Sequence, residues 1–326
     1  MHRRNSVKFA ITTLLSLLVF SANAQDANSY PSKPIRIIVN FPPGGTVDVM
    51  TRGVAQKLTE KWGQAVVVDN RPGAGGNIGA QAVASAEADG YTLLATPPGP
   101  MTINQYLYKD MRFDPAKLSS VIMMASVPNA IAARIDFPAN NVKELIAYTK
   151  ANPGKVSFGS QGNGSTSHLT GQMFATMVGS DMMHIPFKGE GPALTEILGG
   201  RVDLFLGNIS AVLKLYQNKQ IKLLGVASPK RSPMANEIPA SQEFGMPDFV
   251  ASAWFAIAAP PGTPAPIVNK LNAAILEALK LPDTQQKMAA LGGEVVGGSP
   301  ADMTTMVIAE RARWKKVIET ANVKLD

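Results

Sequence analysis

Two adjacent glycines in the segment "FPPGGTVD" follow an apolar run and precede residues with helical spacing. Backbone N–H groups at the start of a helix lack partners within the helix, and the helix dipole favours negative charge there. This pattern favours capture of a carboxylate by Gly44, Gly45 and Thr46. The alternative is a tight turn whose glycines permit unusual backbone angles and whose Asp48 caps or neutralises the helix start. The motif alone leaves both open.

The segment "GSQGNGSTSH" places neutral hydrogen-bonding side chains at a second expected helix start. Ser160, Asn163, Ser165 and Thr166 could face an anion held by the first glycine turn, or they could cap their own helix. His168 among serines raises the alternative of a hydrolase. The chain has no Gly-x-Ser-x-Gly motif, and side chains this close along one helix start splay apart. We therefore expect no nucleophilic catalysis.

Two more glycine-rich segments have less specific patterns. In "FKGEGPAL", Lys188 and Glu190 could contact a ligand or remain solvated loop charges beside a helix that has Pro192 near its start. In "NRPGAGGNIG", the glycine spacing is one residue too long for the dinucleotide fingerprint, and the segment follows the second expected strand instead of the first. A structural turn is favoured there over a nucleotide site.

The elements that must position these turns alternate regularly. "IRIIVN", "AVVVDN" and "YTLLAT" read as buried strands, and Val47, Met50, Val54 and Leu58 recur at helical spacing between the first two. Strands that are apolar on both faces and alternate with helices predict a parallel sheet covered by helices on both sides. The fold class is therefore α/β.

The same pattern restarts in the second half of the chain, which indicates two lobes. The extended apolar segments "VIMMASVPNAIAARI" and "SAWFAIAAPPGTP" flank this second block and are expected to be two crossings between the lobes. We expect lobe 1 to comprise residues 25–126 and 253–326, and lobe 2 to comprise residues 127–252. Two amphipathic helices near the C-terminus should pack on lobe 1. Ligands bind at the carboxyl ends of strands, so two facing lobes predict a cleft.

Composition restricts the class of protein. Basic residues followed by an apolar stretch and small residues predict a cleavable secretory signal over residues 1–24, and hence a periplasmic location. Loss of its three basic residues lowers the formal net charge from +7 to +4, and the chain has no basic run, which argues against nucleic-acid binding. The chain has no cysteine, so neither disulfides nor a common zinc site is expected.

An ordered set of motifs carries a family resemblance over nearly the whole expected mature chain. It comprises "YPSKPIRIIVNFPPGGTVD", "VVVDNRPGAGGNIGAQAVA", "ADGYTLLAT", "GNGSTSHLTGQMF", "HIPFKGEGPALTEILGGRVDLFLGN" and "WFAIAAPPGTPAPIVNKLN". In these motifs the chain resembles the periplasmic receptors of tripartite tricarboxylate transporters, called Bug receptors. The resemblance implies a two-lobed periplasmic binding protein of type II that closes on a small carboxylate and delivers it to membrane subunits. It implies no catalysis and no cofactor, and we expect a monomer.

The resemblance also implies where the ligand binds. One ligand carboxylate should lie near residues 41–46, and the opposite lobe should contribute residues 160–168, residues 189–192 and Asn208. Together with the prolines after the third strand, the candidate ligand-binding residues are Phe41, Pro43, Gly44, Gly45, Thr46, Asp48, Pro97, Pro98, Ser160, Asn163, Gly164, Ser165, Thr166, His168, Gly189, Glu190, Gly191, Pro192 and Asn208.

Two departures from the family pattern bear on the ligand. The chain has "TPPGPM" where relatives usually carry small polar residues, and Phe187 where a tyrosine often stands. Prolines donate no N–H, and unsatisfied buried groups are costly, so an aromatic carboxylate such as a phthalate isomer, or a medium-length dicarboxylate, is favoured over citrate. Alternatively, these prolines only stiffen a loop. A sensory partner of a membrane regulator would share all these features, whereas an exported enzyme would need a base that the sequence does not supply.

Overall fold

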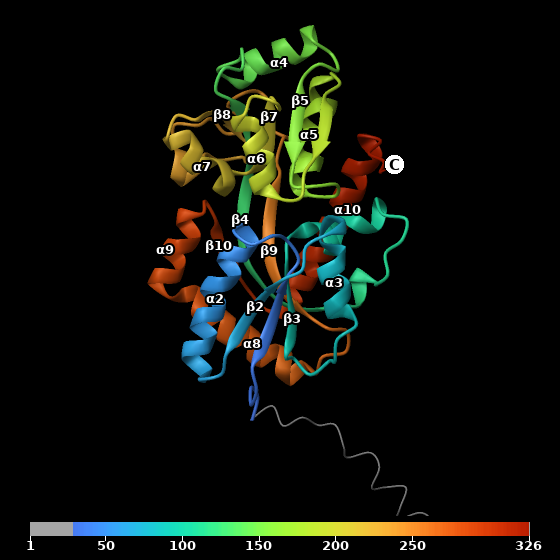
Figure 1. The fold of residues 1–326 in the computed structure, drawn as a ribbon, viewed down its shortest axis with the longest axis vertical. Helices are drawn as coiled ribbons and strands as arrows, with labels where there is room; N and C mark the ends of the chain where they lie inside the picture. The colour runs from blue at the N-terminus through green and yellow to red at the C-terminus, as the bar shows by residue number, and fades with distance from the viewer. Residues whose placement is uncertain (1–28, 326) are drawn as a thin grey trace, which may run out of the picture.

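The computed structural model describes residues 29–325 and shows two lobes, built on two sheets that share one long strand (Figure 1). The predicted two-lobed α/β fold is therefore confirmed. The predicted signal segment, residues 1–24, lies outside the described residues. Within residues 29–325, no helix is both long and apolar enough to cross a bilayer.

The first sheet has a parallel centre, as the apolar runs predicted. Its strands are β1 (Ile35–Val39), β2 (Val66–Asn70), β3 (Thr92–Thr96), β9 (Ser252–Ala259), β10 (Glu294–Gly297) and the first part of β4 (Ser119–Arg134). β1 lies between β2 and β3 and is parallel to both, whereas β9 joins β3 antiparallel. Four of the five residues of β1 are buried, because helices cover both faces of the sheet.

The second sheet repeats this plan on a smaller scale. Its strands are β5 (Ser157–Ser160), β6 (Met183–Pro186), β7 (Leu204–Asn208), β8 (Ile221–Val226) and the last part of β4. β5 is parallel to both β6 and β7, whereas β7 and β8 each pair antiparallel with β4. The carboxyl ends of the parallel strands in each lobe therefore carry the glycine-rich turns.

β4 and β9 form the two expected crossings between the lobes. β4 is 16 residues long and pairs with β9 up to Pro128, and from Asn129 onward it pairs with β7 instead. Figure 1 shows the two strands side by side through the middle of the molecule. The backbone N–H of Asn129 donates to the carbonyl of Ala251 at 2.9 Å, so the two crossings are hydrogen-bonded where they enter the second lobe.

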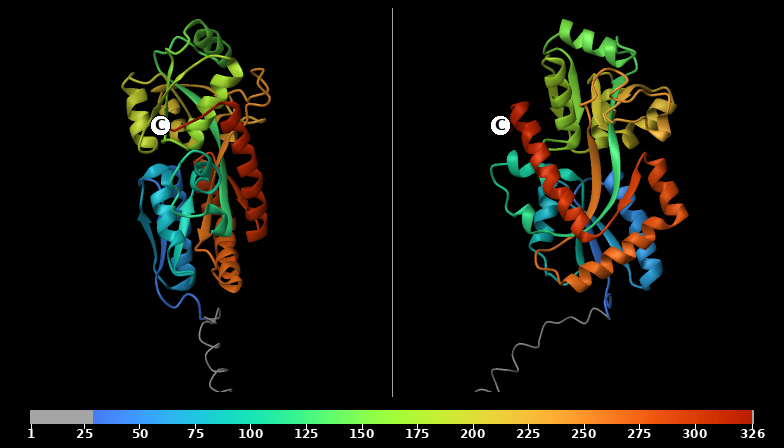
Figure 2. Two further views of the ribbon diagram at one scale, coloured as in Figure 1. Left: turned by 90° about the vertical axis from the view of Figure 1, so that its right-hand side faces the viewer. Right: turned by 180° about the vertical axis from the view of Figure 1, so that it is seen from behind.

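Helices cover the outer faces of both sheets (Figure 2). The described helices are α2 (Thr46–Trp62), α3 (Asn77–Ala84), α4 (Val142–Ala151), α5 (Thr166–Val178), α6 (Glu190–Leu198), α7 (Ile209–Gln217), α8 (Ala265–Lys280), α9 (Pro282–Ala290) and α10 (Pro300–Thr320). Short helical turns are η1 (Ala74–Gly76), η2 (Gly99–Ile103), η3 (Asn104–Tyr106), η4 (Pro115–Lys117) and η5 (Pro233–Ala235). α2, α5 and α6 each begin at one of the predicted glycine-rich turns.

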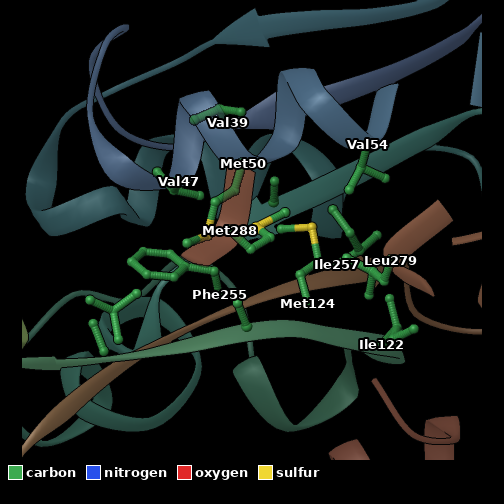
Figure 3. Close-up of a cluster of buried hydrophobic side chains, with 14 of the residues drawn as sticks. Val39, Val47, Met50, Val54, Ile122, Met124, Phe255, Ile257, Leu279 and Met288 are labelled. Carbon is green, nitrogen blue, oxygen red and sulfur yellow. The ribbon is translucent and has the colours of Figure 1, made fainter. Parts of the chain in front are cut away.

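The core of the first lobe lies between α2, the sheet and the C-terminal helices. Figure 3 shows Met50 of α2, Met124 of β4 and Met288 of α9 meeting in this cluster, with Phe255 of β9 beside them. All four side chains are buried. Methionine is unbranched and flexible, so it fills the irregular space where three layers meet.

Helix α10 differs from the expectation that both C-terminal helices pack on lobe 1. Its first half places Met303 and Val307 against the first sheet, in the cluster that contains Leu94. Its second half places Trp314 and Ile318 in the core cluster of the second lobe. The helix therefore lies along both lobes, as the rear view in Figure 2 shows.

Candidate ligand-binding site

The first glycine turn connects β1 to α2 and is held by its own aspartate. Gly44 has φ +82°, a backbone conformation that favours glycine, and its N–H donates to Oδ2 of Asp48 at 2.9 Å. Burial opposes ionisation of Asp48, but hydrogen bonds from Arg52, Gly44 and Asn70 outweigh it and keep the pKa of this carboxyl below its usual value. Asp48 therefore shapes the turn as a carboxylate whose oxygens are already occupied.

At the end of this turn, neutral donors converge on the carboxylate of Glu190. Thr46 donates from its backbone N at 3.2 Å to Oε2 and from Oγ1 at 3.1 Å to Oε1. From the second lobe, Nε2 of Gln161 donates to Oε1 at 2.8 Å, and Nδ2 of Asn208 donates to the same oxygen at 2.5 Å. We call Thr46, Gln161 and Asn208 the donor cluster. It binds one carboxylate from both sides of the cleft.

The fold explains why these residues meet. Gln161 follows β5 and Asn208 ends β7, so both lie at the carboxyl ends of neighbouring parallel strands. Glu190 is the first residue of α6, behind Gly189 with φ +112°. A Cβ on Gly189 would lie 3.2 Å from Cγ of Pro42, so glycine permits this close approach across the cleft.

The donor cluster lines a cavity of about 170 Å³. It is lined by Phe41, Pro42, Pro43, Gly44, Gly45, Thr46, Val47, Pro97, Gln161, Gly189, Glu190, Gly191, Pro192, Asn208 and Phe255. Apart from the donor cluster and Glu190, the lining side chains are apolar or absent. The cavity therefore combines one polar end with an apolar wall.

A larger compartment of about 570 Å³ adjoins this cavity and shares Phe41, Pro42, Gln161 and Gly189 with it. Its other lining residues are Asn40, Pro72, Gly73, Ala74, Gly75, Gly76, Tyr108, Gly162, Asn163, Pro186, Phe187 and Lys188. We call the two compartments together the interlobe cleft. The segment "NRPGAGGNIG" between β2 and α3, interpreted above as a structural turn, thus also forms part of the cleft wall.

Glu190 has no cationic partner among the residues that set its pKa. Although the residue as a whole is half-buried, its carboxyl group lies inside the cavity, and this burial raises its pKa above the usual value. Hydrogen bonds from Thr46 and Asn208 oppose that rise. Asn208 is 1% exposed, and its Oδ1 has no hydrogen-bond partner in the described part of the chain. Asn208 therefore gives its amide N–H to the donor cluster while its acceptor oxygen is buried without a partner.

The structure brings together some of the residues selected from the sequence and not others. Those that line the smaller cavity are Phe41, Pro43, Gly44, Gly45, Thr46, Pro97, Gly189, Glu190, Gly191, Pro192 and Asn208, and Asn163 lines the larger compartment. Those that line neither compartment are Asp48, Pro98, Ser160, Gly164, Ser165, Thr166 and His168. The serine-rich loop therefore contributes less to the cleft than its composition suggests.

Local hydrogen bonds explain where those hydroxyl groups point. Ser165 is the N-cap of α5 and accepts from the backbone N of His168, while its hydroxyl donates to Gly162 O at 2.6 Å. Ser160 Oγ lies 2.7 Å from Nε2 of His184. The capping alternative thus applies to Ser165. Sequence reasoning missed Gln161, a polar residue directly after β5 whose place beside Ser160 could have suggested a role.

His168 and His184 form a stacked pair outside the interlobe cleft. Their ring centroids lie 3.9 Å apart with 13° between the ring planes. Burial lowers the pKa of His168 to about 3, with the neighbouring imidazole adding to the effect, and burial lowers the pKa of His184 to about 4. Both rings are therefore neutral near pH 7, and together they would resist taking up protons.

We expect stability to fall as the pH is lowered from 7 to 5.5. An unfolded histidine binds a proton near pH 6.5, so the unfolded state binds more protons than the folded pair between about pH 6.5 and 4. Each ring should then lower the free energy of unfolding by about 1 kcal/mol between pH 7 and pH 5.5. Urea unfolding at both pH values would measure the loss, and His184→Gln should remove about half of it. An equal loss in that variant would contradict the assignment.

Comparison with known proteins identifies the family. The family model "Tripartite tricarboxylate transporter family receptor" matches residues 50–323. Protein BugT of Bordetella pertussis is 37% identical over 323 residues, which cover 97% of this chain and 99% of BugT.

Two solved structures from Rhodopseudomonas palustris resemble the chain over their full lengths. Rpa4515 with adipate has a TM-score of 0.88 and 38% identity, covering 91% of this chain and 100% of its own. MatC with bound malate has a TM-score of 0.84 and 29% identity, covering 89% of this chain and 100% of its own. The chain therefore belongs to the tripartite tricarboxylate transporter receptor family and is a periplasmic solute-binding receptor of that family.

Proposed function

We propose that this receptor captures a small organic carboxylate in the interlobe cleft and delivers it to the membrane subunits of a tripartite tricarboxylate-type transporter. The observation that carries the proposal is the donor cluster, where Thr46 from one lobe and Gln161 and Asn208 from the other already bind a carboxylate, that of Glu190. Hydrogen bonds from neutral N–H and O–H groups are a strong means of binding an ionised acid. We propose that the protein acts in the periplasm after cleavage of its signal segment.

We propose that the ligand is a medium-length dicarboxylate or an aromatic carboxylate such as a phthalate isomer. One carboxylate would bind the donor cluster, and the remainder would extend into the larger compartment past Phe41 and Phe187, where Lys188 supplies a positive charge. Pro97 lines the smaller cavity, whereas Pro98 lies outside it at the start of a helical turn. The adipate in one related structure and the malate in the other support a carboxylate ligand.

We propose binding without catalysis. A hydrolase would need a nucleophile and a base aimed at the bound ligand. Ser160 and Ser165 bond to neighbouring groups of their own lobe, and His168 lies outside the interlobe cleft. The residues around the cavity are instead suited to holding an acid unchanged.

Calorimetric titration of the mature chain with adipate, terephthalate and citrate tests the function. We expect saturable binding of adipate or terephthalate and no measurable heat from citrate. Ligand at a hundredfold excess over its dissociation constant should also stabilise the fold by about 2.7 kcal/mol, which a thermal shift would detect. Tight binding of citrate without binding of adipate or terephthalate would contradict the proposed ligand class. Failure of all three acids to bind would contradict the proposal for these ligands.

A further inference from the structure

The carboxylate of Glu190 occupies the position that the proposed function assigns to the ligand. All donors of the cluster point at it: the N–H and hydroxyl of Thr46, the amide of Gln161 and the amide of Asn208. The inference below rests on the proposed function, because it concerns the same donors.

Glu190 connects the two lobes. It belongs to α6 of the second lobe, and Thr46 begins α2 of the first. Thr46 Oγ1 also lies 2.8 Å from the hydroxyl of Ser210, the second residue of α7. The hydroxyl of Tyr108 donates to Asn163 O at 3.0 Å on the other side of the cleft. The lobes are thus held against each other, with Glu190 at the polar centre of the contact.

A ligand carboxylate and an ionised Glu190 cannot both use these donors. Nδ2 of Asn208 and Nε2 of Gln161 already bond to one Glu190 oxygen, and the N–H of Thr46 bonds to the other. Two carboxylates at one site also repel each other. Each must therefore displace the other.

We propose that Glu190 is an internal competitor of the ligand, which closes the cleft by binding the donor cluster and withdraws when a ligand carboxylate takes its place. The side chain would then select ligands whose carboxylate binds these donors more strongly than its own does. It would also lower the apparent affinity, because only the fraction of molecules with a free donor cluster can bind. In the absence of ligand the carboxylate of Glu190 thus holds the lobes together through the same donors that a bound acid would use.

Titration of Glu190→Ala with adipate tests the competition. Removing the internal carboxylate should raise the affinity about tenfold or more, the factor expected if at most a tenth of wild-type molecules have a free donor cluster. Glu190→Gln keeps the shape but turns amide hydrogens toward the donor N–H groups, so it should also bind adipate more tightly. Glu196→Ala is the matched control, since Glu196 lies on the same helix in an ion pair with Arg201, and it should leave the affinity unchanged.

Unchanged or weaker binding in both Glu190 variants would overturn the inference. Weaker binding would instead mean that Glu190 binds adipate directly, as a protonated acid that donates to the adipate carboxylate.

A distance measurement without any ligand tests closure independently. The chain has no cysteine, so Gln56→Cys on α2 and Lys214→Cys on α7 introduce two specific spin-label sites at exposed positions. We expect a short distance in the wild-type background and a shift to longer distances with Glu190→Ala. Identical distributions would overturn the inference. This result stands even if no acid binds the wild-type protein, an outcome that would overturn the proposed function alone.

Discussion

Replacing Gly45 by valine should abolish carboxylate binding and leave the fold intact. Gly45 is the N-cap of α2 with φ −75° and ψ 166°, an extended conformation that valine adopts readily. A Cβ there would lie 3.6 Å from the carbonyl oxygen of Pro42 and 3.7 Å from Oε2 of Glu190. The two γ-methyl groups would then enter the space of the bound carboxylate.

The expected loss of affinity is more than about a hundredfold, equivalent to about 2.7 kcal/mol. Calorimetry with adipate measures it, and circular dichroism checks the fold. Gly53→Val is the matched control, because Gly53 lies in the same helix and a Cβ there would meet nothing within 4 Å. An unchanged dissociation constant in Gly45→Val would contradict the assignment of the first glycine turn to the ligand carboxylate.

The largest effect on stability is expected from Trp314→Ala. The side chain is 0% exposed in the core of the second lobe, and its Nε1 donates to Oε2 of Glu310 at 2.9 Å. Truncation leaves a cavity beneath α10 and removes one of the three donors to the Glu310 carboxylate, so the free energy of unfolding should fall by about 3–5 kcal/mol.

Equilibrium urea unfolding measures this difference. Ile308→Ala on the same helix is the matched control, since Ile308 is 60% exposed and should change stability by no more than about 0.5 kcal/mol. Equal losses in the two variants would mean that α10 does not join the core of the second lobe. This comparison therefore also tests whether α10 packs on both lobes and not on lobe 1 alone, as the sequence predicted.

Local patterns predicted the elements well because their causes are local. The spacing of Val47, Met50, Val54 and Leu58 places apolar side chains on one face of a helix, and the glycines before them mark where it begins. The structure confirms that helix, and it confirms the parallel strands that the apolar runs indicated.

The arrangement of the site depends on contacts between distant parts of the chain. Glu190 could be interpreted from sequence as a ligand contact or a solvated charge, because nothing near it reveals that Thr46, 144 residues away, binds its carboxylate. The serine-rich loop shows the opposite case. Its hydroxyl groups could face the cleft or the loop itself, and the direction depends on partners such as His184 that the local sequence does not specify. Residue type indicated the chemistry, but side-chain direction required the fold.

A crystal structure of the receptor with adipate tests the central claim most directly. We expect one adipate carboxylate within hydrogen-bonding distance of the backbone N and Oγ1 of Thr46 and of Nδ2 of Asn208, with the carboxylate of Glu190 turned away from these donors. Adipate bound elsewhere, for example against His168 and His184, with Glu190 still bonded to Thr46, would contradict it.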